Sequence, residues 1–283
     1  MDINTRLNGL VRISEIENEK YSILRQTIGM RQYSRNFERK YKEILSKYKN
    51  KWGTDWMGHF SRLFEYPYVA SRIKGKNILD AGSGISFFPW YLTERGDRVW
   101  CADNDKTVMD VIYSIIKNQE INDGIKRYNN VVPIEIDISD TTTNILSKEF
   151  FDAVYCISVL EHMTSNQIDD TLTVLNRTLK RGGLFLVTFD VGLNNDAPIP
   201  KKDAQNIVSK IYDHGFGCFA SPEAILCYHK GLYTTEWARK NNLRSSLPWK
   251  PLWIHPLKSI LQGYFPRSIR RNLACYCGHF IKL

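Results

Sequence analysis

The segment that most constrains the fold is a glycine turn that directly follows a short apolar run. Residues 78–84 read Ile-Leu-Asp-Ala-Gly-Ser-Gly, so an apolar run passes into an acidic residue and then into two glycines. Glycine has no Cβ, and this turn therefore lets backbone N–H groups approach a ligand closely. A second apolar run, residues 99–102, ends in Asp103, which lies 21 residues after Gly82. That spacing suits an acid that accepts ribose hydroxyls in a doubly wound sheet, so the chain is predicted to bind an adenosine-type cofactor.

Further apolar runs alternate with segments of helical periodicity, which indicates strands that alternate with helices. Apolar residues recur at helical spacing over 108–116 and again at Leu172, Leu175 and Leu179. Gly182–Gly183 is expected to end the second of these helices. The runs that predict strands are residues 78–81, 99–102, 131–136, 151–158, 184–189 and 274–283.

Four ordered motifs between residues 75 and 191 resemble those of class I S-adenosylmethionine (SAM) methyltransferases, in the small-molecule branch known as methyltransferase 11. They are D-A-G-S-G at the glycine turn, the run that ends in Asp137, the segment from F-D-A-V to V-L-E-H over 151–162, and L-K-R-G-G-L-F-L-V over 179–187. The chain departs from the first motif at Ser86, where the family has a third glycine. A dinucleotide-binding turn also requires that glycine, and its absence argues against an NAD-dependent oxidoreductase, as does the expected antiparallel last strand.

The resemblance implies an α/β, Rossmann-like fold: a seven-stranded, mostly parallel sheet with an antiparallel last strand and helices on both faces. It implies SAM as the cofactor and S-adenosylhomocysteine as the product. Residues 1–74 are expected to form a helical N-terminal cap and residues 75–283 the SAM-binding domain, in which 192–272 carry substrate-side helices and a basic insertion. The residues expected to contact the cofactor are Asp80, Gly82, Ser83, Gly84, Asp103, Asn104, Asp137, Ile138 and Ser158, with Arg62 and Tyr66 from the cap.

Two histidines are candidates for a general base, which helps a hydroxyl acceptor because a neutral hydroxyl is a poor nucleophile. His162 follows the fourth run, at the sheet edge where open α/β folds place ligands; the alternative is a structural histidine that packs this loop. His214 lies on a loop that could reach the same pocket.

Three absences narrow the chemistry. The chain lacks the N/D-P-P-Y motif of nitrogen methyltransferases and shows no clear acidic cluster for a catechol-type magnesium site. C-Y-C-G-H at 275–279 has no second ligand pair nearby, so no metal is expected. Methylation of an oxygen atom in a non-catechol acceptor is therefore favoured.

The net charge of +9 is concentrated at the end of the chain. Residues 237–283 contain nine Lys and Arg and no acid, whereas residues 1–236 are balanced. This asymmetry predicts an anionic partner. Aromatic residues and prolines lie among the cations of 244–272, which suits an anionic small molecule or glycan acceptor, a peripheral membrane contact or RNA. A packed, solvated lid is the alternative, and we do not expect nucleic acid as the partner.

The segment R-x-x-E-Y-P at 62–67, together with V-L-E-H, resembles methyltransferases of bacterial surface-polysaccharide biosynthesis. The expected acceptor is thus a sugar phosphate, a nucleotide-linked sugar or a related precursor. An RNA methyltransferase and a non-catalytic partner protein with this fold are the alternatives. The first residues lack a secretory pattern, and no run of about 18 apolar residues predicts a membrane-spanning helix. Together with scattered cysteines, these features favour a cytoplasmic protein.

Overall fold

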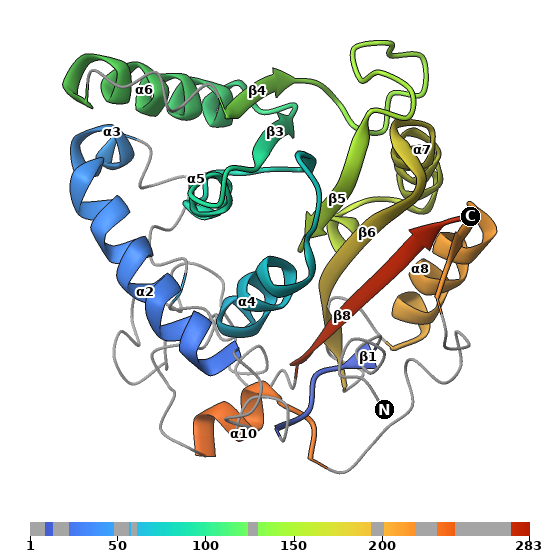
Figure 1. The fold of residues 1–283 in the computed structure, drawn as a ribbon. Helices are drawn as coiled ribbons and strands as arrows, with labels where there is room; N and C mark the ends of the chain where they lie inside the picture. The colour runs from blue at the N-terminus through green and yellow to red at the C-terminus, as the bar shows by residue number, and fades with distance from the viewer. Residues whose placement is uncertain are drawn as a thin grey trace, which may run out of the picture.

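The computed structural model describes residues 9–13, 23–47, 57, 61–123, 130–193, 201–218, 231–240 and 273–283 (Figure 1). Its central element is one sheet. In spatial order the strands are β1 (Gly9–Leu10), β8 (Leu273–Lys282), β6 (Leu179–Gly192), β5 (Phe151–Ile157), β2 (Asn77–Ala81), β3 (Arg98–Asp103) and β4 (Val131–Glu135), and β7 (Phe216–Gly217) also pairs with β8.

The strands from β4 to β6 are parallel, and β8 runs antiparallel to β6. Their order reverses between β2 and β5, because β3 and β4 lie on one side of β2 while β5 and β6 lie on the other. Open α/β sheets bind ligands at the carboxyl ends of the strands beside such a reversal. The predicted Rossmann-like sheet, mostly parallel with an antiparallel last strand, is confirmed.

The outer edge of β8 differs from the expectation, because the described part of the chain forms eight strands rather than seven. β1 pairs with Tyr276 and Cys277, and β7 pairs with Ile281 and Lys282. An edge strand exposes unpaired N–H and C=O groups, and these two short strands cover different parts of that edge. The division into a cap over 1–74 and a domain over 75–283 stays a prediction, although β1 from the first segment joins the sheet.

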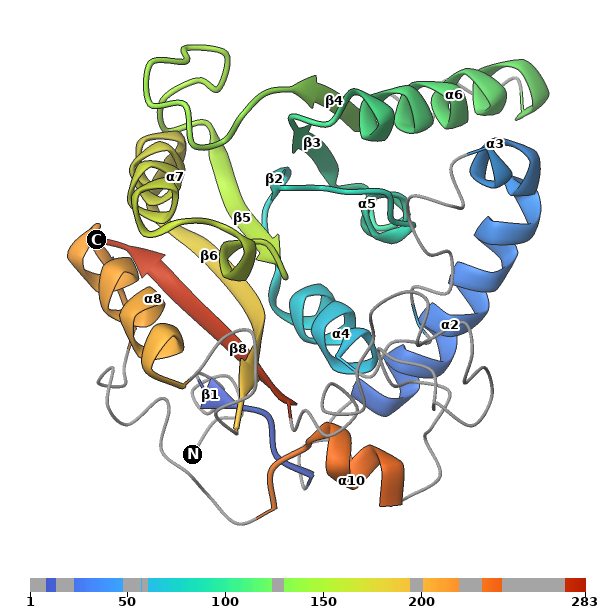
Figure 2. The ribbon, with the colours of Figure 1, turned by 180° about the vertical axis from the view of Figure 1, so that it is seen from behind.

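Helices lie on both sides of the sheet (Figures 1 and 2). One side carries α2 (Ile23–Lys40), α3 (Lys42–Ser46), α4 (Arg62–Arg72), α5 (Phe88–Thr93) and α6 (Lys106–Asp123). The other side carries α7 (Ser165–Thr178) and α8 (Lys201–Asp213). The short helices η4 (Leu160–His162) and α10 (Thr235–Lys240) follow β5 and precede β8 in the chain.

Alternation along the strands divides the core into two clusters, because neighbouring strand residues point to opposite faces. Ile78 and Ala153 belong to the cluster on the side of α4, α5 and α6, whereas Leu79 and Val154 belong to the cluster on the side of α7 and α8. Asp80 has the parity of Ile78. Its carboxyl group is therefore directed to the side of the sheet that α4 covers.

The helix before β6 ends earlier than the glycine pair predicted. α7 ends at Thr178, and Leu179 already has an extended backbone and pairs with Phe151 of β5. Gly182–Gly183 lies inside β6, where the register with β5 is irregular. A Cβ at Gly183 would lie 2.7 Å from the carbonyl oxygen of Lys180. The pair thus permits a tight irregularity of the strand rather than a helix end.

The other local predictions are mostly confirmed where the structure describes them. The helices expected within residues 1–74 are represented in the described part of that segment by α2, α3 and α4, with Pro67 inside α4. The basic insertion expected within 192–272, at 244–272, lies outside the described residues. Among the described helices, none is both long and apolar enough to cross a membrane.

Candidate active site

A cavity of about 780 Å³ lies at the carboxyl ends of the parallel strands, beside the reversal between β2 and β5. All the residues that the sequence predicted as cofactor contacts line it, and so does His162. One side is formed by the residues that follow β2, β3 and β4. The other side is formed by the ends of β5, β6 and β8, with η4. The fold therefore brings together motifs that are more than a hundred residues apart.

The glycine turn after β2 is held by backbone hydrogen bonds to β3. Gly82 and Ser83 donate to the carbonyl oxygen of Ala102 at 2.9 and 3.0 Å, and Gly84 donates to Asp103 Oδ2 at 2.8 Å. Both glycines have positive φ, at 75° and 54°. A Cβ at Gly82 would lie 2.7 Å from Val159, whereas a Cβ at Gly84 would have no atom within 4 Å. Gly84 thus borders open space in the cavity, as close approach by a ligand requires.

Ser86 stands where the family motif has a third glycine, and the structure gives its side chain a local role. Ser86 Oγ accepts a hydrogen bond of 3.0 Å from the N–H of Phe88, the first residue of α5. It also lies 3.3 Å from the hydroxyl oxygen of Tyr66. The substitution therefore supports the turn and leaves the geometry at Gly82 and Gly84 intact.

Asp80 is a buried carboxyl group at the floor of the cavity, with 4% of its surface exposed. Burial raises the pKa of Asp80 to about 7, and the hydrogen bond of 2.7 Å from Ser83 Oγ only partly offsets this effect. Among the hydrogen bonds described for Asp80, none comes from a cationic side chain that would pair with its ionised form. A ligand with an ammonium group would favour that ionised form.

Asp103 and Asp137 are the acids that end the next two apolar runs. Asp103 Oδ1 accepts a hydrogen bond of 2.9 Å from the N–H of Asp105. Asp137 Oδ1 accepts hydrogen bonds from the N–H and Oγ of Ser139, at 2.9 and 2.7 Å. Each carboxylate thus has a defined orientation at the rim of the cavity and retains lone pairs for a ligand.

Helix α4 adds a buried ion pair to the opposite side of the cavity. Glu65 is fully buried, and Arg62 donates to its Oε2. The other oxygen, Oε1, accepts from Ser158 Oγ at 3.1 Å and from Thr188 Oγ1 at 2.7 Å. Arg62 also donates to Ser158 Oγ at 2.8 Å. The network fixes the guanidinium of Arg62 against the end of β5, where it lines the cavity.

Two further carboxyl groups line the same end of the cavity. Asp190 of β6 and Glu161 of η4 each have a buried oxygen, Oδ1 and Oε2, without a hydrogen-bond partner among the described residues. Burial and the nearby Glu65 raise the pKa of Asp190 to about 7, although Arg62 acts in the opposite direction. Burial raises the pKa of Glu161 well above its usual value.

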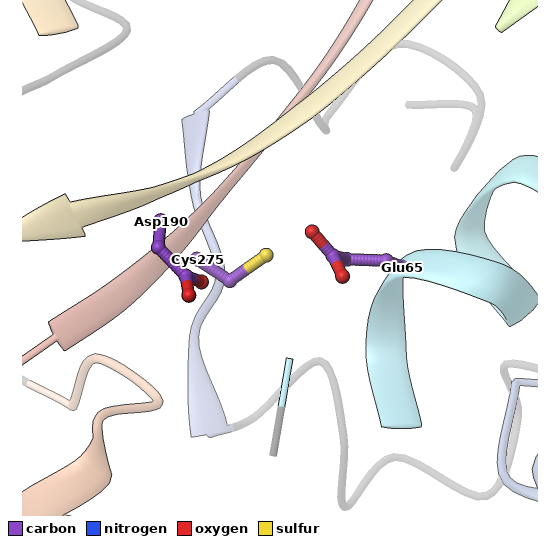
Figure 3. A group of neighbouring side chains, drawn as sticks. All are labelled: Glu65, Asp190 and Cys275. Carbon is purple, nitrogen blue, oxygen red and sulfur yellow. The ribbon is translucent and has the colours of Figure 1, made fainter. Parts of the chain in front are cut away.

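Glu65, Asp190 and Cys275 point toward one another between α4 and the sheet (Figure 3). One oxygen or sulfur atom from each lies within 4.8 Å of the others. Both oxygens of Glu65 already accept hydrogen bonds, one of them from Arg62. Burial also raises the pKa of the Cys275 thiol well above its usual value. A metal would have to displace Arg62 and deprotonate this thiol, so the geometry does not favour a metal here.

The two candidate histidines lie in different places. His162 borders the cavity and is exposed, and burial of part of the ring together with Arg62 lowers its pKa. His214 is not a lining residue. Its Nδ1 lies 2.8 Å from the carbonyl oxygen of Lys210, and its own carbonyl oxygen accepts from Asn176 at 2.8 Å.

The position of His214 corrects the expectation that its loop reaches the pocket. α8 runs back along the sheet, and the adjacent Gly215 accepts a hydrogen bond from Leu283. There β7 pairs with the last residues of β8. These residues lie opposite Leu184, close to where the parallel pairing of β6 begins. His214 is thus at the amino end of the strands, whereas the cavity is at their carboxyl ends.

Sequence reasoning assigned no role to Glu65 or Asp190. The signal for Asp190 was present, since it ends an apolar run just as Asp80, Asp103 and Asp137 do. Glu65 had no comparable signal, because only the packing of α4 against β5 and β6 places it at the site.

A family model described as a methyltransferase domain matches residues 79–187. These residues extend from β2 into β6 and include the glycine turn, Asp103, Asp137 and the V-L-E-H segment. The comparison with curated protein sequences found no match.

Solved methyltransferase structures share the fold at low sequence identity. Phosphoethanolamine N-methyltransferase 2 of Haemonchus contortus is 13% identical, with a TM-score of 0.51, and the match covers 89% of this chain and 59% of that one. Geranyl diphosphate methyltransferase with bound SAM is 12% identical, with a TM-score of 0.51 and coverage of 78% and 86%. A TehB-like SAM-dependent methyltransferase of Corynebacterium glutamicum is 16% identical, with a TM-score of 0.46 and coverage of 89% and 99%.

In the match to the SAM complex of the same Haemonchus enzyme, this chain spans 49%, about half, of that enzyme's length. The first two likenesses above establish the fold, and the family match establishes the domain. Residues 79–187 thus match a methyltransferase domain, and the chain has the Rossmann-like fold of class I SAM-dependent methyltransferases.

Proposed function

We propose that the protein transfers the methyl group of SAM to a hydroxyl oxygen of a polar small molecule or glycan precursor. The observation that carries this proposal is the division of the cavity. One side has the glycine turn and three acids at strand ends, and the other has Asp190 and Glu161, whose buried oxygens lack partners among the described residues. Unpaired buried carboxyl oxygens suit an acceptor that donates hydrogen bonds through its hydroxyl groups.

The first side fits the cofactor group by group. Buried Asp80 is suited to the ammonium of the methionine part, and Asp103 to the ribose hydroxyls. Asp137 and Ile138 border the place expected for adenine, while open space lies beside Gly84. Arg62 is suited to the carboxylate, because nearby carboxyl groups, Glu65 above all, hold its pKa above the usual value although burial alone would lower it.

The reaction needs alignment more than covalent help from the protein. When bound, SAM supplies a methyl group on a positively charged sulfur, which is already a good leaving group. The protein must hold the acceptor oxygen in line with that methyl group, which can account for much of the acceleration. A hydroxyl acceptor also requires a group that removes its proton.

We further propose that the acceptor carries a phosphate, as a sugar phosphate or nucleotide-linked sugar does, for example in surface-polysaccharide biosynthesis. The support is the distribution of charge: residues 237–283 hold nine Lys and Arg and no acid. The carboxyl groups inside the cavity would repel a phosphate there. The phosphate is therefore expected to contact the basic segment while a hydroxyl of the same molecule enters the cavity.

The test has two steps. Calorimetric titration with S-adenosylhomocysteine, with NAD as the control, is expected to show micromolar binding of the first ligand alone. The protein is then incubated with SAM carrying a deuterated methyl group and with sugar phosphates, nucleotide-linked sugars or the matching uncharged sugars. Mass spectrometry should find the label on oxygen of the phosphorylated acceptors. Label on an amine nitrogen or in added RNA, or no label in any acceptor, would overturn the proposal.

A further inference from the structure

Among the described residues, the acceptor end of the cavity holds more carboxyl groups than cations. Glu65, Glu161 and Asp190 act electrostatically on one another, and Arg62 is the cation that acts on all three. Glu65 is committed to the protein, since Arg62, Ser158 and Thr188 donate to its two oxygens. Glu161 and Asp190 each retain a buried oxygen without a hydrogen-bond partner among the described residues.

Asp190 is the better placed of these two for proton transfer. It lies near the carboxyl end of β6, opposite Cys275 of β8, and its Oδ1 is buried while the residue still borders the cavity. Regular strand pairing holds its backbone, because both neighbouring residues of β6 pair with β8. A carboxyl group on a rigid strand is positioned more accurately than one on a loop.

We infer that Asp190 is the general base of the reaction, which accepts the proton of the acceptor hydroxyl, and that Glu161 beside it stays protonated and donates a hydrogen bond to the acceptor. This inference rests on the proposed hydroxyl acceptor. The acceptor oxygen forms its bond to the methyl carbon while the carbon–sulfur bond of SAM breaks. The hydroxyl proton passes to Asp190, and S-adenosylhomocysteine leaves as a neutral thioether, so the charge lost by the sulfonium matches the charge lost by the carboxylate.

The environment of Asp190 agrees with this role. Glu65 and Arg62 face it from α4, Glu161 from η4 and Cys275 from β8, and the pKa of about 7 places its proton exchange at neutral pH. Burial raises the pKa of Glu161 well above its usual value, which favours the protonated form that donates a hydrogen bond. His162 is less suited as a base, because its ring is exposed and its pKa is lowered.

Two measurements test the inference on the full-length protein. In the first, kcat and KM are measured against pH with a phosphorylated sugar acceptor for wild type, Asp190→Asn, Glu161→Gln and His162→Gln. We expect Asp190→Asn to lower kcat at least ~100-fold, as the loss of a general base does, while its affinity for S-adenosylhomocysteine stays within threefold. Wild-type kcat should rise with pH, reach half of its maximum near pH 7 and level off above about pH 8, and His162→Gln should retain at least a fifth of it.

The second measurement needs no acceptor. Carboxyl ¹³C NMR of the complex with S-adenosylhomocysteine should show an aspartate resonance that titrates near pH 7 and is missing from Asp190→Asn, whereas the ligand's ammonium group should lower the pKa of Asp80. Asp110→Asn is the matched control, because Asp110 is exposed on α6 and is not one of the residues that line the cavity. If Asp190→Asn does not fold, Asp190→Glu serves for the assignment, and we expect it to keep the pH dependence at a reduced kcat.

The outcomes separate the two proposals. Full activity of Asp190→Asn, or a resonance of Asp190 that titrates below pH 5, would overturn the role of Asp190 and leave the proposed function standing. Wild-type protein that methylates none of the hydroxyl acceptors would overturn the proposed function. In that case an Asp190 resonance that titrates near pH 7 would still support proton exchange by this carboxyl group. A resonance that titrates below pH 5 would overturn the role of Asp190 as well.

Discussion

Arg62 Nη1 donates a hydrogen bond of 2.8 Å to Ser158 Oγ, although the two residues are 96 positions apart in the sequence. The bond joins α4 to the end of β5, at a residue whose φ of 52° lies in the left-handed region. This backbone conformation is strained for any residue other than glycine, and it persists where the surrounding structure holds it. Here Glu65 and Thr188 complete the network that holds it, at the point where the sides proposed for the cofactor and for the acceptor meet.

Replacement of Glu65 by Ala should strongly destabilise the protein. The change leaves the Arg62 guanidinium without its carboxylate and removes the acceptor of the Ser158 and Thr188 hydroxyls. Breaking a buried pair in this way costs about 3–5 kcal/mol in the free energy of unfolding. Urea denaturation measures the loss. The matched control is Glu43→Ala, at an exposed glutamate of α3, which should change the free energy by less than about 0.5 kcal/mol.

Replacement of Asp103 should weaken cofactor binding more than stability. Asp103→Ala removes both the proposed ribose acceptor and the acceptor of the Gly84 N–H. We expect the Kd for S-adenosylhomocysteine to rise at least ~10-fold, which corresponds to the loss of about 1.4 kcal/mol. Asp103→Asn keeps one carbonyl oxygen and should lose less. Equal Kd values for wild type and Asp103→Ala in calorimetry would show that the ribose binds elsewhere.

The two glycines of the turn should respond differently to Ala. Gly82→Ala places a Cβ 2.7 Å from Val159 at a φ of 75°, so it should lower the melting temperature markedly. The added Cβ of Gly84→Ala has no protein atom within 4 Å, so its cost is the left-handed backbone strain of about 1–2 kcal/mol. Its methyl group enters the space proposed for the cofactor, so this variant should fold and lose affinity for S-adenosylhomocysteine. Thermal melts with and without that ligand separate the two effects, and unchanged affinity of Gly84→Ala would contradict the placement.

Asp80 should make the ligand-free protein less stable as the pH rises. Its pKa is about 7 in the folded protein and near 3.8 in the unfolded chain. The folded state therefore binds more protons at Asp80 between these values, and the contribution of Asp80 to stability is highest below about pH 4 and falls until about pH 7, by roughly 1.4 kcal/mol per unit. Asp80→Asn should flatten this part of the profile and raise the melting temperature at pH 8.

The same substitution should weaken binding of S-adenosylhomocysteine, because the neutral amide cannot pair with an ammonium group. Wild-type affinity should rise with pH through about 7 as Asp80 ionises. Chemical denaturation and calorimetry at pH 5, 6, 7 and 8 test both effects. An Asp80→Asn variant that is less stable than wild type at pH 8, or one that binds the ligand equally well, would refute this role for the carboxylate.

Local sequence determined the strands, the glycine turn and most of the cofactor side of the cavity. Those signals are short-range: a continuous apolar run, two glycines at fixed spacing and an acid at the strand end each act within a few residues. All the cofactor candidates consequently line one cavity. Local signals were less reliable at boundaries, because the glycine pair at 182–183 serves β6 instead of ending α7.

The acceptor side depended on tertiary structure. His162 and His214 had similar local signals, yet the direction of α8 places His214 at the far end of the strands. Glu65 and Asp190 belong to segments more than a hundred residues apart, and only the packing of α4 on the sheet brings their carboxyl groups together (Figure 3). The sequence by itself determined the parallel sheet and the turn, since these follow from local backbone and burial preferences. The buried charges around Arg62 were decided by the fold, because desolvation and pairing exist only once distant segments exclude water from the same space.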